Sequence, residues 1–82
     1  MSVEETMRNY ILENYLFTDD QSALSSSDSF MEKGIIDSTG ILEVIYFLEG
    51  ELGVTVEDEE MIPENLDSVD NIVAFVNKKK AA

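Results

Sequence analysis

The sequence predicts an all-α fold, a four-helix bundle with three longer helices, one short third helix and a long loop between helices 1 and 2. Three stretches of the chain place apolar residues at the spacing of helix turns. The β-branched residues 54–56 have no partner strand elsewhere, so they predict a connector rather than a sheet. With 82 residues, 44% of them apolar, the chain is long enough for one small domain with a single core.

The first helix is expected over residues 3–16, with Ser2 as a candidate N-cap. Its apolar residues follow at helical spacing: Val3, Met7, Tyr10 and Ile11. The polar residues between Thr18 and Ser29 predict a long loop. Several apolar residues in this region are too irregularly spaced for a free linker: Leu24, Phe30, Met31, Ile35 and Ile36. We therefore expect the loop to pack down over the core.

The second helix is expected over residues 38–52. One face carries an apolar stripe at positions i, i+3, i+4, i+7 and i+11: Ile41, Val44, Ile45, Leu48 and Leu52. Gly53 follows the stripe, where a helix commonly ends on a left-handed residue. Leu42 and Tyr46 are apolar residues on the opposite face, and the predicted core does not use them.

Two further helices are expected near the C-terminus. A short one is expected over residues 63–66, because proline suits the first turn of a helix. Ser68 is expected to cap the final helix, whose apolar stripe comprises Val69, Ile72, Val73 and Val76. The lysines 78–80 end that helix, where cations interact favourably with its dipole. We assign residues 1–80 to one domain and expect residues 81–82 to form a frayed tail.

The composition excludes several classes of function. The chain has 18 acidic and 5 basic residues, giving a formal net charge of −13. This charge disfavours binding to nucleic acid or to anionic membranes, and it favours a monomer whose partners carry basic patches. The absence of cysteine and histidine excludes disulfides, zinc or iron–sulfur sites and histidine-based catalysis. No secretory signal or membrane span is recognisable, so we expect a cytoplasmic protein.

Carboxylates can also bind calcium or act in catalysis. An EF-hand loop beginning at Asp28 needs a ligand at position 12 and a glycine at position 6, but these positions hold Thr39 and Lys33. The register beginning at Asp19 fails at position 5, which is Ala23. Nothing in the sequence indicates a cleft for a pair of catalytic carboxylates. We therefore expect neither a metal site nor a catalytic residue.

Asp37 and Ser38 open the second helix. Taken alone, they are typical of an N-cap, since Asp and Ser side chains satisfy the free N–H groups of a helix start. A helix N-terminus also favours a phosphate covalently attached to a serine oxygen. The two residues by themselves favour the N-cap interpretation, whereas their surroundings favour the phosphate.

The surroundings are two short segments on either side of the stripe. The first reads Phe30-x-x-x-Gly34-Ile35-Ile36-Asp37-Ser38, and the second reads Leu52-Gly53-Val54-x-Val56. Together with the acidic first helix and the segment 63–69, this order resembles the acyl carrier protein family, which includes peptidyl and aminoacyl carriers. The resemblance covers nearly the whole chain. In that family an Asp-Ser motif preceded by glycine opens the second of four helices.

The resemblance implies a function. In the family this serine carries 4′-phosphopantetheine, so Ser38 would be the attachment point and would be acted upon rather than catalytic. Asp37 would cap the helix and help present Ser38 to a phosphopantetheinyl transferase. The thiol of the cofactor would hold an acyl or aminoacyl group as a thioester for delivery to enzymes of fatty-acid, polyketide or related biosynthesis. Residues 1–80 would then be a carrier domain and not an enzyme.

The resemblance also implies a partner interface on the second helix. Glu43 and Glu49 match acidic positions that meet basic patches on partner enzymes. Leu42 and Tyr46 match apolar contacts between them, and Glu59 is assigned to the same interface. The alternatives are a solvated helix face for the acids and scattered surface residues for the apolar pair. The expected partners are the transferase, an acyl- or aminoacyl-loading ligase and a downstream transferase or synthase.

Three departures from the family pattern favour a specialised freestanding carrier over a housekeeping fatty-acid carrier. Thr39 stands where leucine is common and makes a smaller, more polar interface contact. Gly40 stands where an acid is common and lowers helix propensity by up to about 1 kcal/mol. The spacing between Val56 and Ser68 is longer than in fatty-acid carriers, so no role is transferred to Ile62.

Three hypotheses follow. A carrier predicts that Ser38 is exposed at a helix start and becomes modified. An acidic helical adaptor, in which Ser38 is only a helix cap, predicts no modification, and Ser38→Ala would then cost about 1 kcal/mol of stability without loss of function. A calcium sensor is disfavoured by the two failed loop registers.

Overall fold

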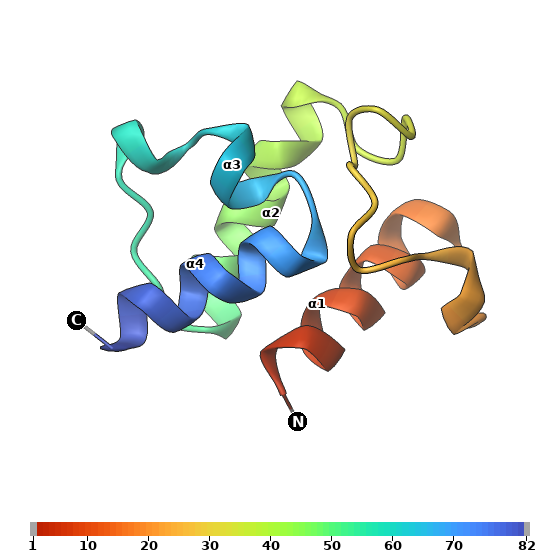
Figure 1. Cartoon of the computed structure of the whole chain (residues 1–82), viewed down its shortest axis with the longest axis horizontal. Helices are drawn as coiled ribbons and strands as arrows, with labels where there is room; N and C mark the ends of the chain where they lie inside the picture. The colour runs from red at the N-terminus through yellow and green to blue at the C-terminus, as the bar shows by residue number, and fades with distance from the viewer. Residues whose placement is uncertain (1, 82) are drawn as a thin grey trace.

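The computed structural model describes residues 2–81, and every regular element in that range is helical (Figure 1). The elements in chain order are α1 (Val3–Ile11), the π-helical turn η1 (Leu12–Leu16), the 3-10 turn η2 (Gln21–Ala23), α2 (Ser38–Glu51), the 3-10 turn η3 (Asp58–Glu60), α3 (Pro63–Leu66) and α4 (Val69–Ala81). The prediction of an all-α fold with three longer helices and a short third helix is confirmed.

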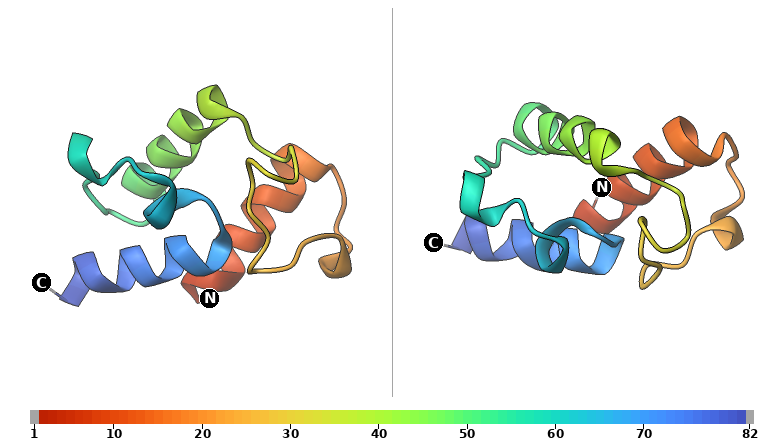
Figure 2. Two further views of the ribbon diagram at one scale, coloured as in Figure 1. Left: turned by 45° about the horizontal axis from the view of Figure 1, so that its top comes forward. Right: turned by 90° about the horizontal axis from the view of Figure 1, so that it is seen from above.

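The longer helices enclose a single core. Figure 2 shows α2 and α4 on opposite sides of the molecule, with α1 at one end and α3 next to the start of α4. The stripe of α2 faces the core through Val44, Ile45 and Leu48, whereas Ile41 and Leu52 at its ends are only partly buried. No helix within residues 2–81 has both the length and the apolar character needed to cross a membrane.

The first helical stretch has the predicted limits. It begins after Ser2, whose Oγ accepts the N–H of Glu5 at 3.1 Å. The π-helical turn extends the helix to Leu16, so α1 and η1 together span the expected residues 3–16. Phe17 follows in a left-handed conformation, with φ 54°. Its side chain is 82% exposed and adds nothing to the core.

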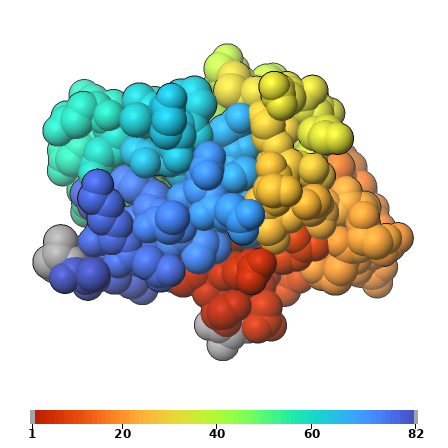
Figure 3. Space-filling view, in the orientation of Figure 1, coloured from red at the N-terminus to blue at the C-terminus, as the bar shows by residue number. Residues whose placement is uncertain are grey.

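The long loop packs onto the body of the molecule, as predicted (Figure 3). Arg8 of α1 donates to the Leu24 carbonyl at 2.5 Å and to the Ser26 hydroxyl at 2.8 Å. The N–H of Asp70 in α4 donates to the Ser26 carbonyl at 2.9 Å. Four of the five expected loop residues are buried or packed against the core: Leu24, Phe30, Ile35 and Ile36.

Met31 is the one of these five loop residues that does not join the core. Its side chain is 46% exposed. The N–H groups of both Phe30 and Met31 are held by Asp67, the first by its carbonyl at 2.7 Å and the second by its Oδ1 at 3.0 Å. The hydroxyl of Ser29 donates to the other carboxylate oxygen. Hydrogen bonds to Asp67, not burial of its own side chain, therefore hold Met31 in place.

Residues 54–56 form a connector, as predicted. Val54 and Val56 are buried and Thr55 is exposed. The described part of the chain contains no strand to pair with them. Instead, Oε2 of Glu49 accepts the N–H of Val56 at 3.2 Å, so a side chain of α2 takes the place of a neighbouring strand.

The final helix begins at the expected cap. The Oγ of Ser68 accepts the N–H of Asn71 at 3.1 Å. α4 continues through Ala81, one residue beyond the expected end of the domain, because alanine has the highest helix propensity. Ala82, the other residue of the expected tail, lies outside the described residues.

Candidate functional site

Ser38 is the first residue of α2, and its side chain is exposed. The N-cap of the helix is Asp37, whose Oδ1 accepts the N–H of Gly40 at 2.7 Å. Between residues 2 and 81 no hydrogen bond involves the Ser38 hydroxyl. The helix start is therefore satisfied by Asp37, and the Ser38 hydroxyl is free. The alternative in which Ser38 itself is the cap disagrees with this geometry.

The loop before α2 holds this pair of residues at the surface. Gly34 has φ 69°, a left-handed conformation that glycine adopts without a Cβ clash. The N–H groups of Ile35 and Ile36 donate to the Phe30 carbonyl at 2.8 and 3.3 Å. Because the side chains of Phe30 and Ile36 are buried in the core, the chain is anchored immediately before Asp37.

The start of α2 fits a phosphate attached to Ser38. The first N–H groups of a helix lack partners within the helix and lie at the positive end of its dipole. Asp37 takes up the N–H of Gly40, which leaves those of Ser38 and Thr39. The Thr39 side chain is also exposed. The exposed Asp37 carboxylate would add a negative charge beside this phosphate.

An apolar groove of about 260 Å³ begins at Ser38 and runs between α2 and α3. It is lined by residues from the loop, from α2 and from the segment around α3: Met31, Ser38, Ile41, Leu42, Ile45, Met61, Ile62, Pro63, Leu66 and Asp67. Leu42 was expected on this surface, but sequence reasoning did not assign Met31, Met61 or Ile62 to it. These three share no helical period with α2, so no sequence pattern connects them.

The apolar residues assigned to the partner interface are exposed beside this groove. Leu42 is 50% exposed and lines the groove, and Tyr46, one turn further along α2, is 71% exposed. Thr39 is exposed at the same end of the helix. The structure therefore brings Ser38, Thr39, Leu42 and Tyr46 together on one surface of α2.

The acidic residues assigned to the interface also have partners within the chain. Oε2 of Glu43 accepts the hydroxyl of Tyr15 at 3.0 Å, which links the end of η1 to α2. Burial raises the pKa of Tyr15 above its usual value, and hydrogen bonds with Tyr10 and Glu43 raise it further. Glu49 holds the Val56 N–H, so it has a structural role in addition to its exposed position.

Glu59 lies apart from this surface. It is exposed in η3, and it does not line the groove beside Ser38. Among residues 2–81, no three carboxylates lie close enough together to hold a metal ion.

The helical fold and the exposed serine at the start of α2 together indicate a small carrier protein. Two curated relatives support this class. The chain is 36% identical over 76 residues to the D-alanyl carrier protein of Streptococcus suis (strain 05ZYH33), an overlap of 93% of this chain and 92% of the relative. It is 30% identical over 79 residues to the probable acyl carrier protein PigG of Serratia sp. (strain ATCC 39006), an overlap of 96% and 90%.

The chain belongs to the acyl carrier protein family, as a specialised carrier. A second D-alanyl carrier protein, from Streptococcus suis (strain 98HAH33), is 34% identical over 93% of this chain and 92% of its own length. No protein-family model matches the chain. Its membership therefore rests on identity with individual relatives over almost their full length.

Proposed function

We propose that Ser38 is the attachment site of 4′-phosphopantetheine and that the chain carries an acyl or aminoacyl group on this arm. The observation that carries the proposal is the free, exposed Ser38 hydroxyl at a helix start that Asp37 already caps. A serine that served only as a cap would accept a hydrogen bond from a backbone N–H with its side-chain oxygen. Carrier proteins of this family generally bear this prosthetic group and are not enzymes.

The modification uses the Ser38 oxygen as the nucleophile. In the presence of a transferase, Ser38 Oγ forms a bond to the phosphorus of coenzyme A that bears the pantetheine. The pyrophosphate bond breaks, adenosine 3′,5′-bisphosphate leaves and the hydroxyl proton passes to a base of the transferase. When bound, the cofactor supplies the terminal thiol that holds the cargo as a thioester. Asp37 keeps the helix start ordered, so that Ser38 is presented in one position.

A small cargo fits this site best. The groove of about 260 Å³ is slightly smaller than the range for ligand pockets, roughly 300–1,000 Å³. It is also open to solvent beside Ser38, Leu42 and Met61, all of which are on its lining. We propose an aminoacyl or short acyl group, with D-alanyl as the first cargo to test because two relatives bear that name.

The proposed partners are a phosphopantetheinyl transferase, a loading ligase and a downstream transferase or synthase. The formal charge of −13 and the exposed acids of α2 favour enzymes with basic patches around the serine-binding site. Leu42 and Tyr46 would supply the apolar contacts of that interface. The interface role of these residues, the monomeric state and the cytoplasmic location stay predictions.

Intact mass spectrometry tests the proposal. The purified chain is incubated with coenzyme A and a broad-specificity phosphopantetheinyl transferase, beside Ser38→Ala and the matched hydroxyl control Thr39→Ala. We expect one phosphopantetheine on the native chain and on Thr39→Ala, and none on Ser38→Ala. If no variant gains mass while circular dichroism shows folded helices, the adaptor hypothesis replaces the carrier.

A further inference from the structure

One wall of the groove beside Ser38 comes from the segment between α2 and α3. Met61 and Ile62 line the groove directly after η3. Their side chains are 38% and 42% exposed, so core packing does not hold them in place. Their position depends on the backbone of η3, a single 3-10 turn with little intrinsic stability.

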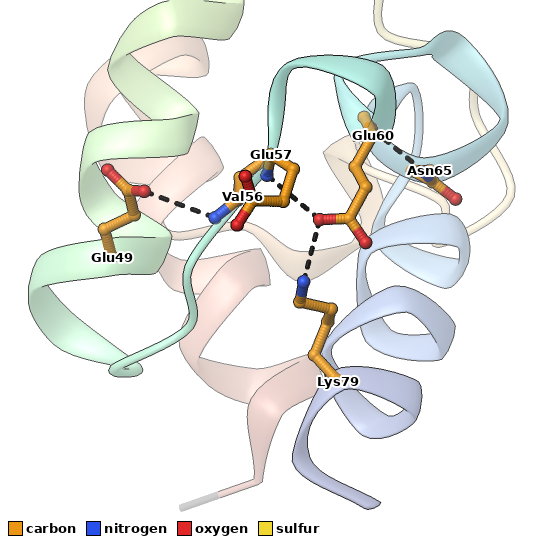
Figure 4. Close-up of polar contacts among 6 residues, drawn as sticks. All are labelled: Glu49, Val56, Glu57, Glu60, Asn65 and Lys79. Carbon is orange, nitrogen blue, oxygen red and sulfur yellow. Dashed lines mark hydrogen bonds and ion pairs between the residues drawn. The ribbon is translucent and has the colours of Figure 1, made fainter. Parts of the chain in front are cut away.

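Glu60 organises that turn. Its Oε1 accepts the N–H of Glu57 at 2.9 Å, which closes a capping box across η3 (Figure 4). Its carbonyl accepts the side-chain amide of Asn65 at 2.9 Å and the N–H of Ile62 at 2.9 Å. Glu60 therefore joins the start of the turn, the groove wall and α3.

Lys79 connects this turn to α4. Its Nζ donates to the same Oε1 of Glu60 at 2.8 Å (Figure 4). The Nζ also lies 5.9 Å from the centre of the Phe75 ring. This is the one ion pair that the structure holds between residues 2 and 81. The two side chains are 26% and 25% exposed, so solvent screens the pair only in part. Lys78 and Lys80, the neighbouring lysines, are exposed and make no ion pair in the described chain.

We propose that Lys79 is a positioning residue, whose ion pair with Glu60 holds the Met61–Ile62 wall of the groove beside Ser38. Nineteen residues separate the pair in sequence, so α4 determines the placement of a wall to which it contributes no side chain. The opening of the groove then depends on one ion pair. Its use in sheltering cargo rests on the proposed function, whereas the position of the wall does not.

The ion pair between Glu60 and Lys79 should respond to ionic strength. A partly exposed ion pair weakens as ionic strength rises, because the screening length falls from about 10 Å at 0.1 M to about 3 Å at 1 M. In the native chain, added salt should therefore loosen the wall. In a chain without the Lys79 charge, the same salt should have no further effect there.

The test uses the unmodified protein, so its result does not depend on whether Ser38 can be loaded. Lys79→Met keeps the length of the side chain and removes its charge, Lys79→Arg keeps the charge, and Lys78→Met is the matched control. Amide hydrogen exchange and methyl resonances are measured by NMR at Met61 and Ile62. Both N–H groups donate within the turn, to the carbonyls of Asp58 and Glu60, so their protection reports its opening.

We expect amide exchange at Met61 and Ile62 to rise about two- to fivefold in Lys79→Met, the range for losing a partly exposed ion pair. The methyl resonances of the wall should shift, while Lys79→Arg and Lys78→Met match the native chain. The inference is overturned if exchange at the wall is unchanged in Lys79→Met, or if exchange in the α4 core at Ile72 rises equally. It is also overturned if salt loosens the wall as much in Lys79→Met as in the native chain.

Discussion

Gly40 lies so close to Ile36 that a Cβ at position 40 would be 2.7 Å from the Cγ2 of Ile36. Ile36 is buried and β-branched, so this methyl group cannot move away easily. The sequence indicates only that Gly40 lowers helix propensity. The packing shows that a residue without a Cβ is needed at this position. It allows the start of α2 to approach the loop that leads into Asp37.

Gly40→Ala should destabilise the protein although alanine is the better helix former. Overpacking a core contact costs about 1–3 kcal/mol, which exceeds the gain of up to about 1 kcal/mol in propensity. Urea unfolding followed by circular dichroism measures the difference. Gly50→Ala is the control in the same helix, because nothing lies within 4 Å of a Cβ there and it should stabilise by about 0.5–1 kcal/mol. Equal stabilisation by both variants would contradict the close contact.

Substitution of Asp37 by alanine should lower the free energy of unfolding more than substitution of Ser38 does. Asp37→Ala removes the cap of α2 and should lower the free energy of unfolding by about 1 kcal/mol. Ser38→Ala removes a hydroxyl without a hydrogen bond in the described chain and should change it by less than about 0.5 kcal/mol. Chemical unfolding of both variants tests this. A loss of about 1 kcal/mol in Ser38→Ala would restore the cap interpretation.

Phe17→Gly should stabilise the protein. Phe17 has φ 54°, where a residue with a Cβ is disfavoured by about 1–2 kcal/mol, and its exposed ring contributes little packing. The free energy of unfolding should rise by about 0.5–1 kcal/mol. This figure allows for the cost of the greater backbone entropy of glycine in the unfolded chain. Phe17→Ala keeps the Cβ and is the control, with little change expected in thermal melting. A loss of stability in Phe17→Gly would show that the ring contacts the fold after all.

The Glu60–Lys79 pair should make stability depend on pH in the acid range. The hydrogen bond from Lys79, followed by that from the Glu57 N–H, lowers the pKa of Glu60 below its usual 4.5. A folded-state pKa below the unfolded value means that the contribution is complete above about pH 4.5 and is lost as the pH falls through the folded pKa.

Comparison of variants isolates this contribution from that of the other acids of η3. The difference in unfolding free energy between the native chain and Lys79→Met should be constant above about pH 6 and shrink as the pH falls below about 4.5. Lys78→Met corrects for the general loss of a positive charge near Glu60, since Lys78 also lowers the Glu60 pKa. A difference that stays constant to low pH would show that the pair is not charged.

Much of this architecture follows from local patterns in the chain. The span 3–16, the start of α2 at Ser38 and the short helix 63–66 match their predicted limits, because caps, proline and the period of apolar residues act within one or two turns. The groove does not follow from such a pattern. Met31 and Ile62 reach it from segments on either side of α2, and neither lies on a helical stripe.

Local spacing and charge were thus enough to assign an all-helical domain, an acidic surface and an Asp-Ser pair at a helix start. Tertiary structure alone decided that Glu49 of α2 holds the connector at Val56 and that Lys79 of α4 holds Glu60. The reason is physical. Helix formation depends on residues three or four positions apart, whereas these hydrogen bonds depend on where the backbone of another segment comes to lie.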